Sequence, residues 1–169
     1  SDFYENMKRD IDSTAFMELS LNEVGRESCL PNKVFDFDPK PYHLFHYVVS
    51  GKGKLIYGNK TYFLKAGGLF YIAPNDKPNY APDEENPWTY IWVGFDGIMA
   101  NELLRLSNIS KTNPIFSDVQ NELKPLFLDI ESRRREDGSI ALYSLGSLYQ
   151  LLALMIEITS KGSIPPAHS

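Results

Sequence analysis

The sequence is poor in cysteine and in positive charge. Its 169 residues include a single cysteine, Cys29, so no disulfide can form within the chain. Lysine and arginine number 17 against 22 acidic residues, which gives a net charge of −5. Surfaces that bind nucleic acid normally carry an excess of basic residues, so this charge argues against nucleic-acid binding by this chain alone.

The sequence also shows no signal peptide and no uninterrupted apolar run of membrane-spanning length. With a lone cysteine, these absences predict a cytoplasmic protein that makes no membrane contact. Hydrophobic residues make up 43% of the chain and aromatic residues 13%. A chain of this length and composition can bury a full core.

Short aromatic and β-branched runs fill the stretch from residue 42 to 95. The runs are HLFHYVVS, KLIYG, TYFL, LFYIA and WTYIWVGF. Runs of this kind, separated by glycine, proline, asparagine and aspartate, are typical of strands. Gly51-Lys52-Gly53 and Gly58-Asn59 predict hairpin turns, because glycine and asparagine accept positive φ. Several strands at this spacing predict a closed or double-sheeted β unit.

Alternation along the last of these runs separates two kinds of side chain. Tyr90 and Trp92 fall on one face, whereas Ile91, Val93 and Phe95 fall on the other. The purely apolar set suits packing against a second layer. Tyrosine and tryptophan combine apolar rings with polar tips, which suits a pocket for a polar ligand.

The period changes to that of helices after residue 97. We expect a short helix over 98–106, a second over 117–130 that Ser117 caps and Pro125 kinks, and a strong helix over 140–158. The last helix is too apolar to be only peripheral: it packs on the sheet or pairs with its copy in a second subunit. The predicted units are an N-terminal arm (1–38), a barrel (39–97), a helical dimerisation segment (98–160) and a tail (161–169).

Four features in this order carry a family resemblance. They are Lys40-Pro41 before the first long strand, the S-G-K-G turn, the segment AGGLFYIAP and the ending W-x-x-x-F. The stretch resembles the N-terminal effector-binding domain of AraC/XylS-type bacterial transcription regulators, and most of all the multiple-sugar-metabolism regulators. The resemblance implies a mainly β fold: a cupin-like double-stranded β-helix, or jelly-roll barrel, followed by two or three helices.

The same resemblance implies a function. The barrel would bind a small polar effector such as a mono- or oligosaccharide, and the C-terminal helices would form a homodimer. DNA would be bound only through a helix-turn-helix domain, which is absent from this sequence. The arm before Pro41 would be the element that changes on binding, as a lid over the ligand.

Ligand-binding residues follow from the resemblance position by position. It implies roles for Lys40 before the proline, Tyr80, Tyr90 and Trp92. The family often has arginine at the first position, where its guanidinium can bind two sugar hydroxyls at once. Lys40 would offer a single ammonium group instead. His46 is a further ligand-binding candidate, or else a structural histidine of the barrel.

A metal-dependent cupin enzyme, such as a sugar isomerase or a dioxygenase, is the alternative function. His43 and His46 are three residues apart, so on a strand they point to opposite faces and cannot share one ion. We therefore expect no metal, no cofactor and no catalytic residue. A dimerisation module with a filled barrel is a third interpretation.

Overall fold

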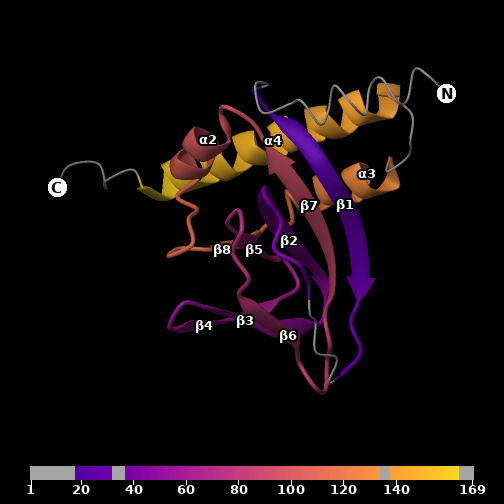
Figure 1. Ribbon diagram of the computed structural model, residues 1–169, viewed down its shortest axis with the longest axis vertical. Coiled ribbons are helices and arrows are strands. Elements are labelled where there is room, and N and C mark those ends of the chain that lie inside the picture. Colours follow the sequence, from indigo (N-terminus) through magenta and orange to yellow (C-terminus); the bar gives the residue numbers. More distant parts are fainter. Residues whose placement is uncertain (1–17, 32–36, 134–137, 164–169) are drawn as a thin grey trace.

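The computed structural model describes residues 18–31, 37–133 and 138–163. Two antiparallel sheets form a barrel, and helices pack against the outer face of the larger sheet (Figure 1). The larger sheet has the order β1 (Ser20–Ser28), β7 (Thr89–Asp96), β2 (His43–Ser50), β5 (Gly68–Ile72) and β8 (Ile115–Ser117). The smaller sheet has the order β4 (Lys60–Lys65), β3 (Lys52–Tyr57) and β6 (Asn79–Pro82). The helices are α2 (Ala100–Leu106), α3 (Lys124–Ser132) and α4 (Gly138–Ser163). The predicted fold class, a cupin-like barrel followed by helices, is confirmed.

Strands β2, β3, β4, β5 and β7 lie where the aromatic and β-branched runs predict them. The hairpin turn predicted at Gly58-Asn59 is confirmed, since it joins the paired strands β3 and β4. The prediction at Gly51 is wrong, because β2 and β3 belong to different sheets and the turn there carries the chain from one sheet to the other. Gly51 and Gly58 have φ values of 73° and 63°, which residues with a side chain rarely adopt.

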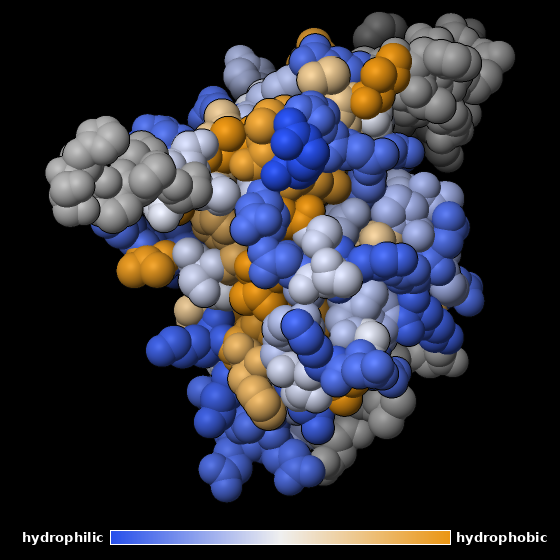
Figure 2. Space-filling model, turned by 90° about the vertical axis from the view of Figure 1, so that its left-hand side faces the viewer, coloured by the Kyte–Doolittle hydropathy of each residue, from blue (hydrophilic) through white to orange (hydrophobic). Residues whose placement is uncertain are grey.

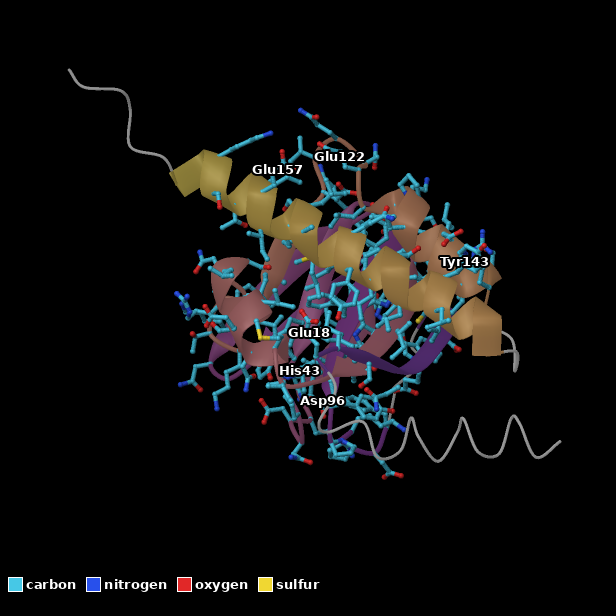
Figure 3. The ribbon with its side chains drawn as sticks, turned by 90° about the horizontal axis from the view of Figure 1, so that it is seen from above. Glu18, His43, Asp96, Glu122, Tyr143 and Glu157 are labelled. Carbon is cyan, nitrogen blue, oxygen red and sulfur yellow. The ribbon has the colours of Figure 1, made fainter. Side chains whose placement is uncertain are left out.

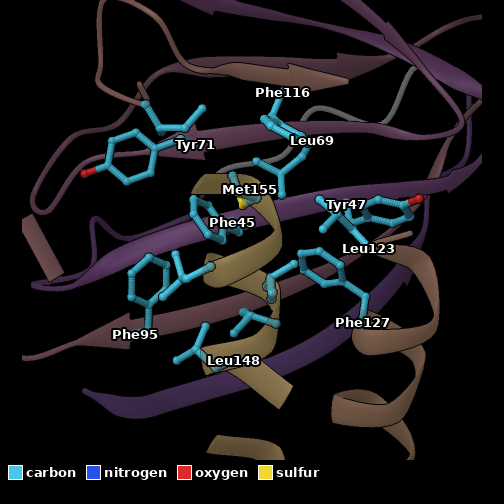
Figure 4. Packing of buried hydrophobic residues seen from close by; sticks show 14 of the residues in the cluster. Phe45, Tyr47, Leu69, Tyr71, Phe95, Phe116, Leu123, Phe127, Leu148 and Met155 are labelled. Atoms are coloured by element: carbon cyan, nitrogen blue, oxygen red, sulfur yellow. The ribbon is translucent and has the colours of Figure 1, made fainter. Parts of the chain in front are cut away.

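Strands β2, β5 and β7 carry a hydrophobic core on the face that meets the helices (Figure 4). The alternation predicted for β7 is confirmed, since Ile91, Val93 and Phe95 all point into this core. The helices contribute Leu123, Phe127, Leu148, Leu151 and Met155. Burying each such side chain contributes roughly 1.5–3 kcal/mol, so this layer holds the helices to the barrel.

The opposite face of the same strands closes the barrel against the smaller sheet. Its buried residues form a second core with Leu44, Val48, Phe70, Ile72 and Tyr90 from the larger sheet, Leu55, Tyr57 and Leu64 from the smaller one, and Trp88. Because both faces of β2 are covered, its first six residues are buried without interruption. The larger sheet therefore separates a helix-facing core from the barrel interior.

Helix α3 corrects the prediction for residues 117–130. The helix begins at Lys124, so Pro125 lies in its first turn and causes no kink. Ser117 ends strand β8, and the buried Asp118 carboxylate accepts backbone N–H groups of Glu122, Leu123 and Lys124 at 2.8–3.2 Å. It also accepts the Tyr47 hydroxyl at 2.7 Å, which ties this loop to β2.

Strands β1, β6 and β8 lie outside the aromatic and β-branched runs. Strand β1 pairs with β7 over nearly its whole length and lies inside the segment that we predict as an arm. Strand β6 occupies the polar, proline-containing stretch, and β8 lies beyond the expected end of the barrel. Residues 1–17 and 32–36 of the predicted arm are outside the described residues.

Helix α4 runs from Gly138 to Ser163 and so extends beyond both ends of the predicted helix at 140–158. By length and composition alone, Leu142–Gly162 could cross a membrane, and one third of that stretch is buried. Its buried side chains, including Leu148, Leu151 and Met155, pack on the sheet as those of a core helix do. The apolar composition beyond that face calls for a separate explanation.

Candidate functional site

A small cavity of about 150 Å³ lies inside the barrel, between the larger sheet and β6. It is lined by Glu23, Phe37, Lys40, Leu44, His46, Tyr80, Tyr90 and Trp92. All five residues predicted as ligand contacts are therefore brought together around one space. Their role in binding stays a prediction, while their common location is a property of the fold.

Aromatic rings form most of the cavity wall. The ring centroids of Phe37 and Tyr80 lie 5.3 Å apart, those of Tyr80 and Tyr90 6.1 Å, and those of Tyr90 and Trp92 6.1 Å. Tyr90 and Trp92 come from β7 and Tyr80 from β6, so the two sheets together hold the wall. Such rings bind the apolar C–H face of a ligand and keep their polar tips available for its hydroxyl groups.

The position of Trp92 depends on a glycine in the neighbouring strand. Gly25 is the Cα partner of Trp92 in the β1–β7 pairing. A Cβ atom on Gly25 would lie only 2.0 Å from Cζ2 of the indole. The ring therefore rests directly on the backbone of β1, and any side chain at position 25 would displace it.

His46 lies at the buried side of the cavity and is 3% exposed. Its ring stacks on that of Phe70 at 4.4 Å with an interplanar angle of 3°. Burial lowers the pKa of His46 to about 3, so the imidazole is neutral at physiological pH. Its Nδ1 atom is buried and has no hydrogen-bond partner among the residues that the structure describes, which is rare and costly for a polar atom in a native protein.

Other polar groups line the cavity. The hydroxyls of Tyr80 and Tyr90 are hydrogen-bonded to each other, and burial raises the pKa of both well above the ordinary tyrosine value. Both phenols are therefore protonated and can donate as well as accept. Glu23 bonds the Tyr42 hydroxyl, and the Lys40 carbonyl accepts the Asn75 N–H at 2.7 Å.

Sequence reasoning missed three lining residues: the apolar Leu44, and Glu23 and Phe37. Glu23 belongs to β1, whose weak pattern gave no sign that it pairs with β7. Its place opposite Gly94 is what brings it to the cavity face. Phe37 follows an undescribed stretch, and only its 5.3 Å contact with Tyr80 places it at the site.

The two strand histidines face opposite sides of β2, as predicted. His43 points into the helix-facing core, stacks on Phe95, and its Nδ1 lies 2.6 Å from the Tyr71 hydroxyl. Burial lowers its pKa, while the charge of nearby Asp96 acts in the opposite direction (Figure 3). Over residues 18–31, 37–133 and 138–163, no three histidine, cysteine or acidic residues come together as a metal site would require.

A larger open depression of about 1070 Å³ lies on the outer side of the smaller sheet. Lys52, Lys54, Glu84 and Glu85 line it, and all four are solvent-exposed. It therefore offers solvated charges rather than an enclosed surface. The interior cavity is the better candidate site, because it combines aromatic walls with an unpaired buried nitrogen.

The fold and the cavity together define a class: a β barrel that can enclose a small polar ligand and that carries helices on its outer face. The family described as the AraC-like ligand binding domain matches residues 20–153. The chain belongs to this family.

Individual relatives agree with this assignment. The chain is 31% identical over 156 residues to the Msm operon regulatory protein of Streptococcus mutans, covering 90% of this chain and 55% of the relative. It is 30% identical over 148 residues to the lactose operon transcription activator of Staphylococcus xylosus, covering 83% and 52%. The chain thus spans about half the length of these relatives. The crystal structure of apo ToxT from Vibrio cholerae has a similar fold, with a TM-score of 0.58 and 14% identity over 89% of this chain and 61% of that one.

Proposed function

We propose that this chain is the effector-binding domain of a transcription regulator and that a sugar binds in the interior cavity. The observation that carries the proposal is the aromatic cavity with the unpaired Nδ1 atom of His46 at its buried side. A sugar has apolar C–H faces and a rim of hydroxyls. The indole of Trp92 suits the first, and the imidazole, phenol and ammonium groups suit the second.

The names of the relatives support a sugar over other polar ligands. They regulate the msm and lactose operons by name, and they cover most of this chain. Relatives named as regulators also favour a sensor over the metal-dependent cupin enzyme. One stoichiometric transition metal in the purified protein would revive that enzyme alternative.

A thermal-shift screen against mono- and oligosaccharides tests the proposal. A ligand at 100 times its dissociation constant stabilises the folded state by about 2.7 kcal/mol, which raises Tm by roughly 5 °C at this size. We expect a selective shift that Trp92→Ala abolishes. Phe63→Ala is the matched control, because that exposed aromatic lies outside the cavity. A flat panel, or a shift that survives Trp92→Ala, would contradict the proposal.

The outward side of α4 supports a homodimer. Leu142, Gly146, Tyr149, Ala153, Ile156 and Ser160 recur at intervals of four and three residues, the spacing of a coiled-coil seam. They lie on the side of the helix away from the sheet, and Leu142 is 70% exposed. On the face that Figure 2 shows, apolar side chains form a strip bordered by hydrophilic ones; this strip runs down over the barrel and is not confined to α4. A second copy that packs along this seam would explain why α4 is apolar on two sides.

Analytical ultracentrifugation of Ala153→Arg tests the seam. The arginine would place two like charges near a two-fold axis, so we expect a monomer. Asn101→Arg, which adds the same charge at an exposed position of α2, should leave the dimer intact. A monomeric unsubstituted protein, or an Ala153→Arg dimer, would contradict the seam.

The remaining parts of the proposal concern the longer protein. DNA would be bound through a helix-turn-helix domain in the half of the relatives that this chain does not cover. A regulator of this kind acts in the cytoplasm. The ligand would regulate the protein by binding one of its conformations more tightly than another. A ligand that binds both conformations equally does not shift the equilibrium between them.

A further inference from the structure

The charges around the cavity are unbalanced toward negative. Glu23 lines the cavity, and Glu27 lies on the same face of β1, opposite Tyr90. The charges of both carboxylates contribute to the raised pKa of Tyr80, so both act on the space that a ligand would occupy.

Positive charge in the described cavity comes from one side chain. Lys40 is the only lysine or arginine among the described lining residues, and the buried His46 is neutral. Phosphate sites are normally built from arginine forks, several lysines or backbone N–H groups at a helix N-terminus. The described helices pack on the other face of the larger sheet, so none of them offers its N-terminus to the cavity.

The volume limits what can be enclosed. A cavity of about 150 Å³ holds one six-membered ring, whereas pockets for drug-sized ligands measure about 300–1,000 Å³. The cavity is only partly enclosed, so the substituents of a bound ring that point inward are the ones that would lie within a few ångströms of the lining side chains. At such distances salt screens the repulsion between two negative charges only weakly.

We infer that the cavity encloses a single uncharged sugar ring and discriminates against the phosphorylated form of the same sugar. This inference rests on the proposed function and narrows its ligand class. The aromatic wall and His46 bind the neutral ring, while Glu23 and Glu27 repel a phosphate. The domain would thus sense a sugar before phosphorylation and ignore the product of a sugar kinase reaction.

Isothermal titration with two matched pairs tests the inference: galactose with galactose 6-phosphate, and glucose with glucose 6-phosphate. We expect the sugar of at least one pair to bind, with its 6-phosphate at least tenfold weaker. Glu23→Gln keeps the shape of the side chain and removes its charge. It should therefore reduce the ratio of the two dissociation constants, 6-phosphate over sugar, at least threefold. Glu84→Gln removes one charge from an exposed loop residue and should leave the ratio unchanged.

The outcomes separate the inference from the function. A 6-phosphate that binds as well as its sugar would overturn the inference and leave the sensor function standing. If Glu23→Gln leaves the ratio of dissociation constants unchanged, or if Glu84→Gln changes it equally, then the charge of Glu23 is not what discriminates against the phosphate. If none of the four compounds binds while a larger saccharide does in the screen above, the single-ring limit is wrong. If no saccharide binds at all, the sensor function falls and the inference falls with it.

Discussion

Gly25→Ala adds one methyl group to β1, yet it should disturb both folding and binding. The new Cβ atom would lie 2.0, 2.4 and 2.5 Å from the Cζ2, Cη2 and Cε2 atoms of Trp92. Carbon atoms pack at about 3.5–4.0 Å, so the indole or the strand must move by roughly 1.5 Å. The ring lines the cavity, so a displacement of this size would change the shape of the cavity.

The magnitude follows from that forced displacement. Overpacking a well-packed site typically costs about 1–3 kcal/mol, and we expect a loss of unfolding free energy in this range. A ring displaced into a 150 Å³ cavity occupies space that the ligand needs. Sugar affinity should therefore fall at least tenfold, which corresponds to about 1.4 kcal/mol.

Urea denaturation and sugar titration measure the two effects on the same protein. Gly162→Ala is the matched control: nothing lies within 4 Å of its added Cβ, and it occupies α4 outside the proposed seam. The same change there should leave the protein as stable or stabilise it by up to about 1 kcal/mol. In a Gly25→Ala/Trp92→Phe protein the smaller ring should recover part of the lost stability, so the two effects will not add. Unchanged stability and unchanged affinity in Gly25→Ala would refute the reasoning.

Three further predictions concern buried polar groups. His46→Leu should change the free energy of unfolding by less than about 1 kcal/mol, because the buried nitrogen that it removes makes no hydrogen bond to the described residues. Calorimetry should show that this variant no longer binds the sugar. If binding persists, His46 is not part of the binding site. The pKa of His46 is about 3 in the folded protein and 6.5 in the unfolded chain. Between these two values the unfolded chain binds one more proton than the folded protein, so the free energy of unfolding decreases as the pH is lowered. Between pH 7 and 5 this loss should be about 2 kcal/mol and absent from His46→Leu, so equal slopes for the two proteins would contradict the buried neutral imidazole. Asp118→Ala leaves three backbone N–H groups and the Tyr47 hydroxyl without their acceptor, and chemical denaturation should show a cost of about 3 kcal/mol, against almost none for the exposed Glu84→Ala.

The sequence predicted those parts of the fold that local chemistry decides. Strand β2 and the alternation of β7 follow from side-chain type, and the hairpin at Gly58 follows from backbone freedom. The common location of Lys40, His46, Tyr80, Tyr90 and Trp92 was also anticipated. Tyr90 and Trp92 share a face by alternation, and the family resemblance supplied Lys40 and Tyr80.

Long-range pairing decided what sequence reasoning missed. Strand β1 has no clean alternation because a bulge between Leu21 and Glu23 breaks its register, and its partner lies some 70 residues further along the chain. The carboxylate of Glu23 and the close approach at Gly25 follow from that pairing alone. The start of α3 was also predicted wrongly. Ser117 looks like a helix cap in the sequence, but it ends strand β8. The Asp118 carboxylate that follows accepts backbone N–H groups of the loop before the helix, and the helix begins only at Lys124.

The larger sheet explains how one barrel can both bind a ligand and carry helices. Along β1, Glu23, Gly25 and Glu27 share the face of the cavity, whereas Val24 and Arg26 face the helical layer. Arg26 reaches Glu131 of α3 at 2.6 Å, so the strand that supports the indole of Trp92 also contacts a helix. A partly exposed ion pair of this kind contributes only about 0–1 kcal/mol, which is too little to hold the fold together. The helices are instead held by the apolar core, and β1, like β2, β5 and β7, has one face toward the barrel interior and the other toward the helices.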